Sequence, residues 1–179
     1  MRVIAGEFRG RRLKTLPGLD VRPTPDRLRE ALFNVLAPRL EGCAFVDAYA
    51  GCGSVGIEAL SRGAARVVFI ERARAAAWTI HENLRSLGIK GGFEVRQGKA
   101  ATLLERATGD IVFLDPPYTN EREYELSLGV LGADPPPLVI VQHASRHVLR
   151  DACGGLVRTR VLKQGDNSLS FYEPRSPEA

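Results

Sequence analysis

The chain has 179 residues, of which 44% are hydrophobic and 26% charged, a composition typical of one globular domain and not of a disordered or collagen-like protein. No apolar run reaches the roughly 20 residues of a membrane-spanning helix, and the first residues do not resemble a secretory signal, so no membrane association is expected. The three cysteines are widely spaced and contain no Cys-x-x-Cys pair, so we expect no disulfide framework, no metal site and a reducing, cytoplasmic location.

The net charge of +4 is concentrated in the first part of the chain. Residues 1–39 contain nine basic and four acidic side chains, which gives them a charge of +5 and leaves −1 for all the rest. A basic segment on a nearly neutral body favours a surface that binds a polyanion. A solvated face that only keeps the protein in solution would have the same composition.

Residues 1–21 are expected to form a small basic β extension, with Gly6, Gly10 and Gly18 at its turns. A helix is predicted over 25–37, with Thr24 as its cap and Pro25 at its first position. From about residue 43, short apolar runs typical of buried parallel strands alternate with helical stretches. The expected strands are 44–48, 66–71, 93–97, 110–115 and 138–143, and the expected helices are 54–62, 73–87, 99–107 and 121–131.

This alternation predicts an α/β fold with helices on both faces of a mostly parallel sheet. Two more β-like runs, 156–163 and 169–173, predict a closing antiparallel hairpin. We expect the main domain to cover residues 22–174, after the extension, with a frayed tail over 175–179. Trp78, in the helix predicted over 73–87, is expected to pack in the core.

A glycine-rich turn follows the first strand of the predicted sheet. Gly51, Gly53 and Gly56 form a Gly-x-Gly-x-x-Gly sequence at a strand-to-helix junction, where glycine allows a sharp turn and the close approach of a ligand. Glu71 lies twenty residues after Gly51, at the end of the next strand, where a carboxylate can accept hydrogen bonds from ribose hydroxyls. The pattern favours a cofactor that contains adenosine, the alternative being a plain turn beside a surface glutamate.

A dinucleotide and S-adenosylmethionine would both fit this loop. Asp47, which precedes the glycines at the strand end, favours S-adenosylmethionine, because its carboxylate can hold the cationic methionine amine. The predicted cofactor-binding residues are Asp47, Ala50, Gly51, Gly53, Glu71 and Arg72.

The chemistry is indicated by the sequence Asp115-Pro-Pro-Tyr118, which leaves the end of an apolar strand, where ligands of open α/β sheets bind. An exocyclic amine of a base is a poor nucleophile, and hydrogen bonds to the Asp115 carboxylate and the Pro116 carbonyl would orient it for attack. Asp115 could also accept the released proton. Tyr118 offers a face for stacking of a splayed-out base. The alternative is a proline turn with Tyr118 packed in the core.

Together these motifs resemble those of S-adenosylmethionine-dependent amino-methyltransferases. The chain as a whole resembles the RsmD family, which methylates guanine N2 in 16S ribosomal RNA. The resemblance covers nearly the whole chain, and its matching stretches are Met1–Gly6, Phe8–Leu13, Arg22–Glu30, Leu32–Asn34, Asp47–Gly53, Glu58–Ala64, Asp115–Tyr118 and Gly165–Tyr172.

The resemblance implies a Rossmann-like class I methyltransferase with a seven-stranded, mostly parallel sheet and an RNA-contacting amino-terminal extension. It implies S-adenosyl-L-methionine as cofactor and 16S rRNA, within an assembled or assembling small ribosomal subunit, as substrate. We expect the chain to act as a monomer. The candidate contacts to RNA phosphates are Arg9, Arg11, Arg12 and Lys14.

The chain departs from the family pattern at three positions. Cys52 stands where the family usually has serine, and Gln142 stands where it often has glutamate, with no role expected for this glutamine. Lys99 replaces the Asp or Asn that touches the adenine amine, and a lysine cannot accept that hydrogen bond.

Two other functions fit the same sequence features. One is an adenine-N6 methyltransferase acting on DNA or RNA, because Asp-Pro-Pro-Tyr suits both amines. The other is a non-catalytic RNA-binding assembly factor with a relic cofactor pocket. A third function, that of a nicotinamide oxidoreductase, does not explain the Asp-Pro-Pro-Tyr sequence.

Overall fold

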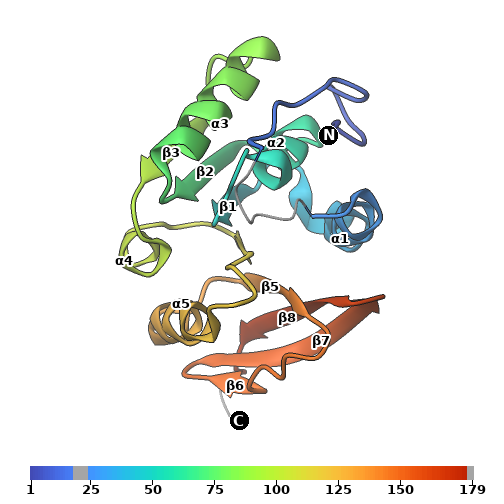
Figure 1. Cartoon of the computed structure of the whole chain (residues 1–179). Coiled ribbons are helices and arrows are strands. Elements are labelled where there is room, and N and C mark those ends of the chain that lie inside the picture. Colours follow the sequence, from blue (N-terminus) through green and yellow to red (C-terminus); the bar gives the residue numbers. More distant parts are fainter. Residues whose placement is uncertain (18–23, 177–179) are drawn as a thin grey trace.

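The structure, a computed structural model, describes residues 1–17 and 24–176 and is built around one sheet with helices on both sides (Figure 1). The helices are α1 (Asp26–Leu40), α2 (Ser54–Ser61), α3 (Arg74–Ser86), α4 (Ala100–Leu104) and α5 (Glu121–Ala133). The strands are β1 (Ala44–Ala48), β2 (Arg66–Glu71), β3 (Phe93–Gln97), β4 (Ile111–Leu114), β5 (Leu138–Ala144), β6 (Ala152–Cys153), β7 (Leu156–Gln164) and β8 (Asn167–Pro174). In the described part of the chain, no helix is long and apolar enough to cross a membrane.

The strand order is β3-β2-β1-β4-β5-β8-β7-β6, and the first five of these strands are parallel. β8 pairs antiparallel with β5 and with β7, which confirms the predicted mostly parallel sheet with a closing hairpin. The sheet has eight strands where seven were expected, because the two-residue β6 adds to the edge of β7. The hairpin turn is also tighter than predicted, since pairing continues to Gln164 and Asn167 and Gly165 supplies the positive φ of a two-residue turn.

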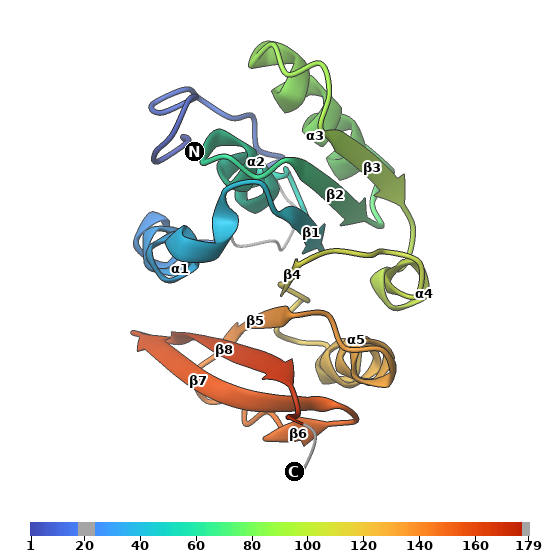
Figure 2. The ribbon, with the colours of Figure 1, turned by 180° about the vertical axis from the view of Figure 1, so that it is seen from behind.

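The two faces of the sheet have separate apolar cores. Alternate residues of the parallel strands point to opposite faces, so β1, β2, β4 and β5 each contribute to both cores. Figure 2 shows the sheet from behind, with α1, α2 and α3 on one side and α4 and α5 on the other. Phe45, Phe69 and Phe113 belong to the core under the first group, and Val46, Val68 and Val112 to the core under the second. This explains the nearly continuous apolar runs in the sequence.

α1 differs from its prediction at both ends. It begins at Asp26, with Pro25 as its N-cap residue and no side-chain cap, so the prediction that Thr24 caps this helix was wrong. The Thr24 hydroxyl is bound elsewhere, as described below. The helix continues through Pro38 to Leu40, because Leu40 extends the buried stripe that includes Leu36.

The prediction that Trp78 packs in the core was also wrong. The buried side chains of α3 include Ala76, Ala77, Ile80 and Leu84, and these lie toward the sheet. Trp78 lies on the opposite side of the helix and is 59% exposed.

Residues 1–17, called here the arm, pack along α1, α2 and α3 instead of forming the predicted small strands. A single antiparallel bridge joins Arg2 to Arg12, with turns at Gly6 and Gly10. A Cβ on Gly6 would lie 1.9 Å from the Ser61 carbonyl oxygen, so only glycine allows this approach. Gly18, the third predicted turn glycine, lies outside the described residues.

Buried polar side chains hold the arm in place. The Glu58 carboxylate of α2, which is 0% exposed, accepts hydrogen bonds from the backbone N–H groups of Ile4 at 2.8 Å and Ala5 at 2.9 Å. The Asn83 amide of α3 accepts from the Lys14 N–H at 2.8 Å and donates to the Lys14 carbonyl at 3.1 Å. The position of the arm is therefore determined by directional hydrogen bonds to two helices.

Replacement of Glu58 should loosen the attachment of the arm. Glu58→Gln keeps the side-chain shape but leaves one oxygen to serve two backbone donors and the Arg62 guanidinium. We expect a loss of about 1.5–3 kcal/mol in the free energy of unfolding, the range for hydrogen bonds to charged groups, with faster tryptic cleavage within the arm. Urea unfolding and limited proteolysis measure both effects. Glu94→Gln, at an exposed ion pair on β3, is the control, and equal behaviour of the two variants would contradict the anchoring role.

Candidate active site

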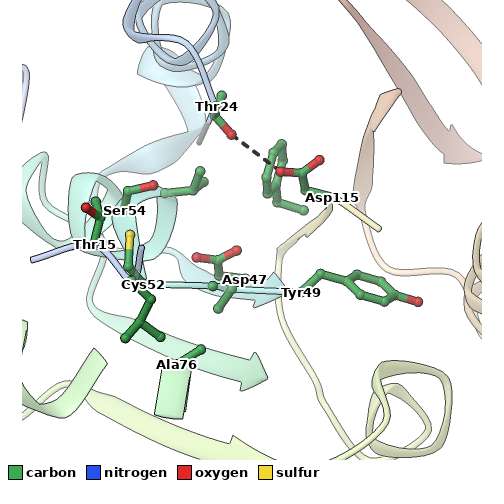
Figure 3. Close-up of a pocket in the computed structure, with 13 residues that line it drawn as sticks. Thr15, Thr24, Asp47, Tyr49, Cys52, Ser54, Ala76 and Asp115 are labelled. Atoms are coloured by element: carbon green, nitrogen blue, oxygen red, sulfur yellow. Dashed lines mark hydrogen bonds between the residues drawn. The ribbon is translucent and has the colours of Figure 1, made fainter. Parts of the chain in front are cut away.

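A cavity of about 270 Å³ lies at the carboxyl ends of β1 and β4 (Figure 3). Its walls come from distant parts of the chain: Thr15 and Leu16 of the arm, Thr24 before α1, the loop after β1, and Asp115 after β4. Asp47 and Asp115 both line it, in agreement with the prediction that the glycine loop and the Asp-Pro-Pro-Tyr sequence share one crevice. An acidic cavity at the carboxyl edge of a parallel sheet is suited to a small ligand with positive charge.

The glycine loop is held by the strand end that precedes it. The Asp47 carboxylate accepts the Gly56 N–H at 2.8 Å, which fixes the first turn of α2 relative to β1. Gly56 must be glycine, because a Cβ there would lie 2.3 Å from the Phe69 ring. Tyr49 has a φ of 63°, an uncommon conformation for a residue with a side chain, and its hydroxyl is bound by Glu123 and Ser127. Backbone strain of this kind often occurs at ligand sites.

Glu71, at the end of β2, also holds the loop. Its carboxylate accepts the Gly51 N–H and the Ala73 N–H, each at 2.8 Å. Each carboxylate oxygen has a further lone pair, so the partly buried side chain can bind the glycine loop and still accept a ligand hydroxyl.

The two cavity aspartates have unusual acidities. Burial raises the pKa of Asp47 to about 7, although the hydrogen bond from Gly56 opposes this rise. Burial, together with the negative charge of Asp47, raises the pKa of Asp115 to about 8. Two carboxyl groups with raised pKa values in one cavity are a feature of functional sites, where a cationic ligand can favour their charged forms.

A chain of hydrogen bonds connects Asp115 to the C-terminal hairpin. The Thr24 hydroxyl lies 3.5 Å from Asp115 Oδ2 and 3.1 Å from Gln142 Oε1 (Figure 3 shows the contact to Asp115). Gln142 Nε2 lies 3.3 Å from the Tyr118 hydroxyl, which in turn lies 2.7 Å from Asn167 Oδ1. Thr24 and Gln142 are 5% and 2% exposed, so both are buried beside the cavity. The carboxylate and the aromatic ring of the Asp-Pro-Pro-Tyr sequence are thereby joined through residues to which the sequence assigned no site role.

For one of these two residues, the sequence contains a feature that could have indicated a site role. Gln142 is a polar residue near the carboxyl end of β5, next to β4 in the sheet, which is where site residues of α/β folds occur. Thr24 had no comparable signal, because its two partners are 91 and 118 residues away in the sequence.

The other predicted cofactor residues have different positions. Ala50 and Gly51 line the cavity, and Gly53, with a φ of 84°, is the N-cap residue of α2. Glu71 touches the cavity wall through Gly51, and Arg72 follows it as an exposed side chain. Lys99, at the position where the resemblance implies Asp or Asn, is exposed before α4.

The remaining parts of the Asp-Pro-Pro-Tyr sequence lie beside the cavity and outside its lining. The Pro116 carbonyl accepts a hydrogen bond from Tyr124 at 3.4 Å, and its second lone pair can accept from a ligand. Tyr118 is 38% exposed, so it is not packed in the core.

The four candidate RNA contacts are exposed on the arm. Arg11 donates to the Ser86 carbonyl at the end of α3, and Lys14 pairs with Glu82 at 3.1 Å. These two side chains therefore follow α3, and an RNA on the arm would also lie near that helix.

The chain was compared with known proteins. A family model described as "Conserved hypothetical protein 95" matches residues 1–173. A Bacillus subtilis (strain 168) protein named "Putative rRNA methyltransferase YlbH" is 33% identical over 98% of this chain and 100% of its own length. Ribosomal RNA small subunit methyltransferase D of Escherichia coli (strain K12) is 40% identical over 66% of this chain, an alignment that spans 60% of that protein.

A solved structure from Escherichia coli, described as "Putative methyltransferase yhhF", has the same architecture. It is 33% identical and superposes with a TM-score of 0.83 over 99% of each chain. The family model and the Bacillus subtilis relative each match nearly the whole chain. The chain therefore belongs to the RsmD family of rRNA methyltransferases.

Proposed function

We propose that this protein transfers a methyl group from S-adenosyl-L-methionine to the exocyclic N2 amine of a guanine in 16S rRNA, within an assembled or assembling small ribosomal subunit in the cytoplasm. The observation that carries the proposal is the position of Asp115, which lines the same cavity as Asp47 and the glycine loop and is followed by Pro-Pro-Tyr. The reaction forms a bond between N2 and the methyl carbon, breaks the sulfur–methyl bond, and releases one proton from the amine.

The residues of the cavity fit S-adenosylmethionine. Asp47 offers a buried carboxylate to a cationic amine, and Glu71, at the next strand end, offers carboxylate oxygens to ribose hydroxyls. Thr15 and Leu16 close the side of the cavity formed by the arm. When bound, the cofactor supplies an electrophilic methyl group on a sulfonium.

Asp115 is suited to act on the nucleophilic amine. Its carboxylate can accept a hydrogen bond from N2 and so orient the nitrogen lone pair toward the methyl group, with the Pro116 carbonyl as a second acceptor. Burial raises the pKa of Asp115 to about 8, so the ligand-free protein holds this group mostly protonated at neutral pH, and a bound cationic cofactor would favour its ionised form. Once ionised, a carboxylate with a raised pKa is a stronger base than an ordinary aspartate and can receive the proton that the amine loses.

Thr24 and Gln142 position this group. Thr24 holds the Asp115 carboxylate, and Gln142 links Thr24 to the hydroxyl of Tyr118, whose ring we assign to stacking with the target base. Arg9, Arg11, Arg12 and Lys14 are assigned to RNA phosphates, which position the enzyme without reading sequence.

Analysis of the methylated nucleoside tests the reaction. Small subunits from cells that lack the gene are incubated with the protein and labelled S-adenosylmethionine, and the RNA is digested for mass spectrometry. We expect N2-methylguanosine. N6-methyladenosine would support the adenine-N6 alternative, and absence of label on the RNA would support the non-catalytic assembly factor.

Asp115→Asn tests the role of the carboxylate. The amide keeps the side-chain shape but cannot accept a proton, so we expect kcat to fall roughly 100- to 10,000-fold, the usual contribution of a positioned base. Cofactor affinity by calorimetry should change only a few-fold, because Asp47 and Glu71 provide the proposed cofactor contacts. An unchanged kcat would remove Asp115 from the mechanism.

Glu71→Ala should have the opposite effect. Loss of a partner for the ribose and for two backbone N–H groups should weaken cofactor binding by ~1–3 kcal/mol, while kcat at saturating cofactor falls much less. Glu94→Ala, at a partly exposed glutamate on the neighbouring strand β3, is the matched control. Equal affinities in calorimetry would show that Glu71 only shapes the loop.

The raised pKa of Asp47 predicts two opposite pH dependences. Without ligand, the folded protein retains a proton that the unfolded chain releases near the ordinary pKa of 3.8, so Asp47 lowers the free energy of unfolding as the pH rises from there to about 7. A cationic ligand binds the ionised carboxylate, so cofactor affinity should increase over the same range, by at most about tenfold per pH unit.

Asp47→Asn should remove the Asp47 contribution to both dependences, while Asp115, whose pKa is raised chiefly by burial, keeps its own. The variant should melt at a higher temperature than the wild type near neutral pH without ligand, and should bind cofactor weakly with a shallower pH profile between about pH 5 and 7. Thermal melts and calorimetry across this range check the two effects. A pH dependence of affinity as steep in the variant as in the wild type would assign it to another group.

A further inference from the structure

The exposed face of α3 has a composition unlike that of an ordinary solvated helix. It carries Trp78, the only tryptophan of the chain, with 59% of its surface exposed. The exposed side chains Arg74, His81 and Arg85 share this face, and these four residues are called here the α3 stripe. A single exposed aromatic ring is not unusual by itself, but a ring between basic groups offers a ligand both a stacking face and positive charge.

The spacing of the stripe shows that its members are aligned. They lie at helical positions i, i+4, i+7 and i+11, which at about 100° per residue fall within an arc of about 60°. The first and last members are about 16 Å apart along the axis, at 1.5 Å per residue. The buried residues of α3 point toward the core on the other side, so no part of the stripe is needed for packing against the sheet.

The stripe connects the cavity to the arm. Its first member, Arg74, lies three residues after Glu71, and Ala76 in the same helical turn lines the cavity. Toward the other end of α3, Arg11 donates to the Ser86 carbonyl. Lys14 pairs with Glu82, the one acidic residue of α3, so the negative charge beside the stripe is matched. The arm thus runs beside α3 (Figure 1), and two of its basic side chains, Arg11 and Lys14, lie at the same helix as the basic groups of the stripe.

We propose that the α3 stripe is an RNA-docking surface, on which Trp78 stacks with an unpaired base while Arg74 and Arg85 contact phosphates on either side of it. This inference rests on the proposed function and names the part of the protein that holds the RNA outside the cavity. Positive charge around one aromatic platform is typical of proteins that bind single-stranded nucleic acid. A protein partner would instead require a wider apolar patch than a single exposed ring.

The single tryptophan gives a direct readout of stacking. Because all tryptophan fluorescence comes from Trp78, titration with a single-stranded RNA oligonucleotide should quench it, and a fully paired RNA duplex of equal length should quench it less. Filter binding of the same RNAs gives the bound fraction independently. Full binding of the single strand with unchanged Trp78 fluorescence would overturn the stacking role.

Substitutions separate stacking from charge. Trp78→Ala should weaken binding of the single strand about 5- to 150-fold, the range for loss of one stacked base, and Trp78→Phe should restore most of it. Arg74→Ala with Arg85→Ala should reduce the slope of log affinity against log salt by about 1.4, or about 0.7 for each phosphate contact. The control, Arg106→Ala with Arg150→Ala, removes the same charge from exposed sites away from α3 and should leave the slope unchanged.

The substrate particle completes the test. With small subunits from cells that lack the gene, the Trp78→Ala variant should have a raised KM for the particle, an unchanged cofactor affinity and a kcat close to that of the wild type. An unchanged KM, or equal salt slopes for the stripe and control variants, would overturn the proposal. If the wild type itself transfers no methyl group, the proposed function fails, whereas the fluorescence and filter-binding results still decide whether the stripe binds RNA.

Discussion

The site depends on the parallel pairing of β1 with β4, two strands that are separated by more than sixty residues of sequence. Their register places Ala48 opposite Leu114, so the residues that follow the two strands leave the sheet side by side. The glycine loop follows β1, and the Asp-Pro-Pro-Tyr sequence follows β4. A shift of this register by one residue would exchange the two faces of a strand and would separate the groups proposed to hold the cofactor from those proposed to orient the base.

The same pairing brings two acidic side chains close to one cavity. The negative charge of Asp47 contributes to the raised pKa of Asp115, and burial is the larger cause for both groups. These carboxylates lower the stability of the ligand-free protein at neutral pH, and they are placed where a cation would offset that cost. The uncommon φ of Tyr49 lies at the same strand end. The strained backbone of Tyr49 and the two carboxyl groups with raised pKa values thus lie together where the proposed ligand would bind.

The sequence was sufficient for features determined by neighbouring residues. The strand-to-helix order, the glycine turn and the acidic residues at strand ends were all predicted, because each depends on a local pattern of a few residues. The prediction for Trp78 was wrong because a hydrophobic side chain on a helix is buried only if it faces the core. Trp78 lies on the side of α3 opposite Ile80 and Leu84. Thr24 acquires its role only through tertiary contacts, one of them across 118 residues, and no local pattern indicates such a contact. Gln142 was indicated only by its position near the carboxyl end of β5.

The arm is attached so that it can detach locally while the rest of the protein stays folded. Among the described arm residues, only Val3 and Leu13 are buried apolar side chains, whereas the sheet core contains dozens of tightly packed ones. A segment attached mainly by hydrogen bonds can detach as a unit at a fraction of the free energy of global unfolding. Thr15 and Leu16 would leave with it, which would open one wall of the cavity while the sheet stays folded. Exchange of a small ligand would then follow the rate at which the arm opens. Backbone amides of the arm, such as that of Lys14, would exchange with solvent deuterium long before those of β1 and β4.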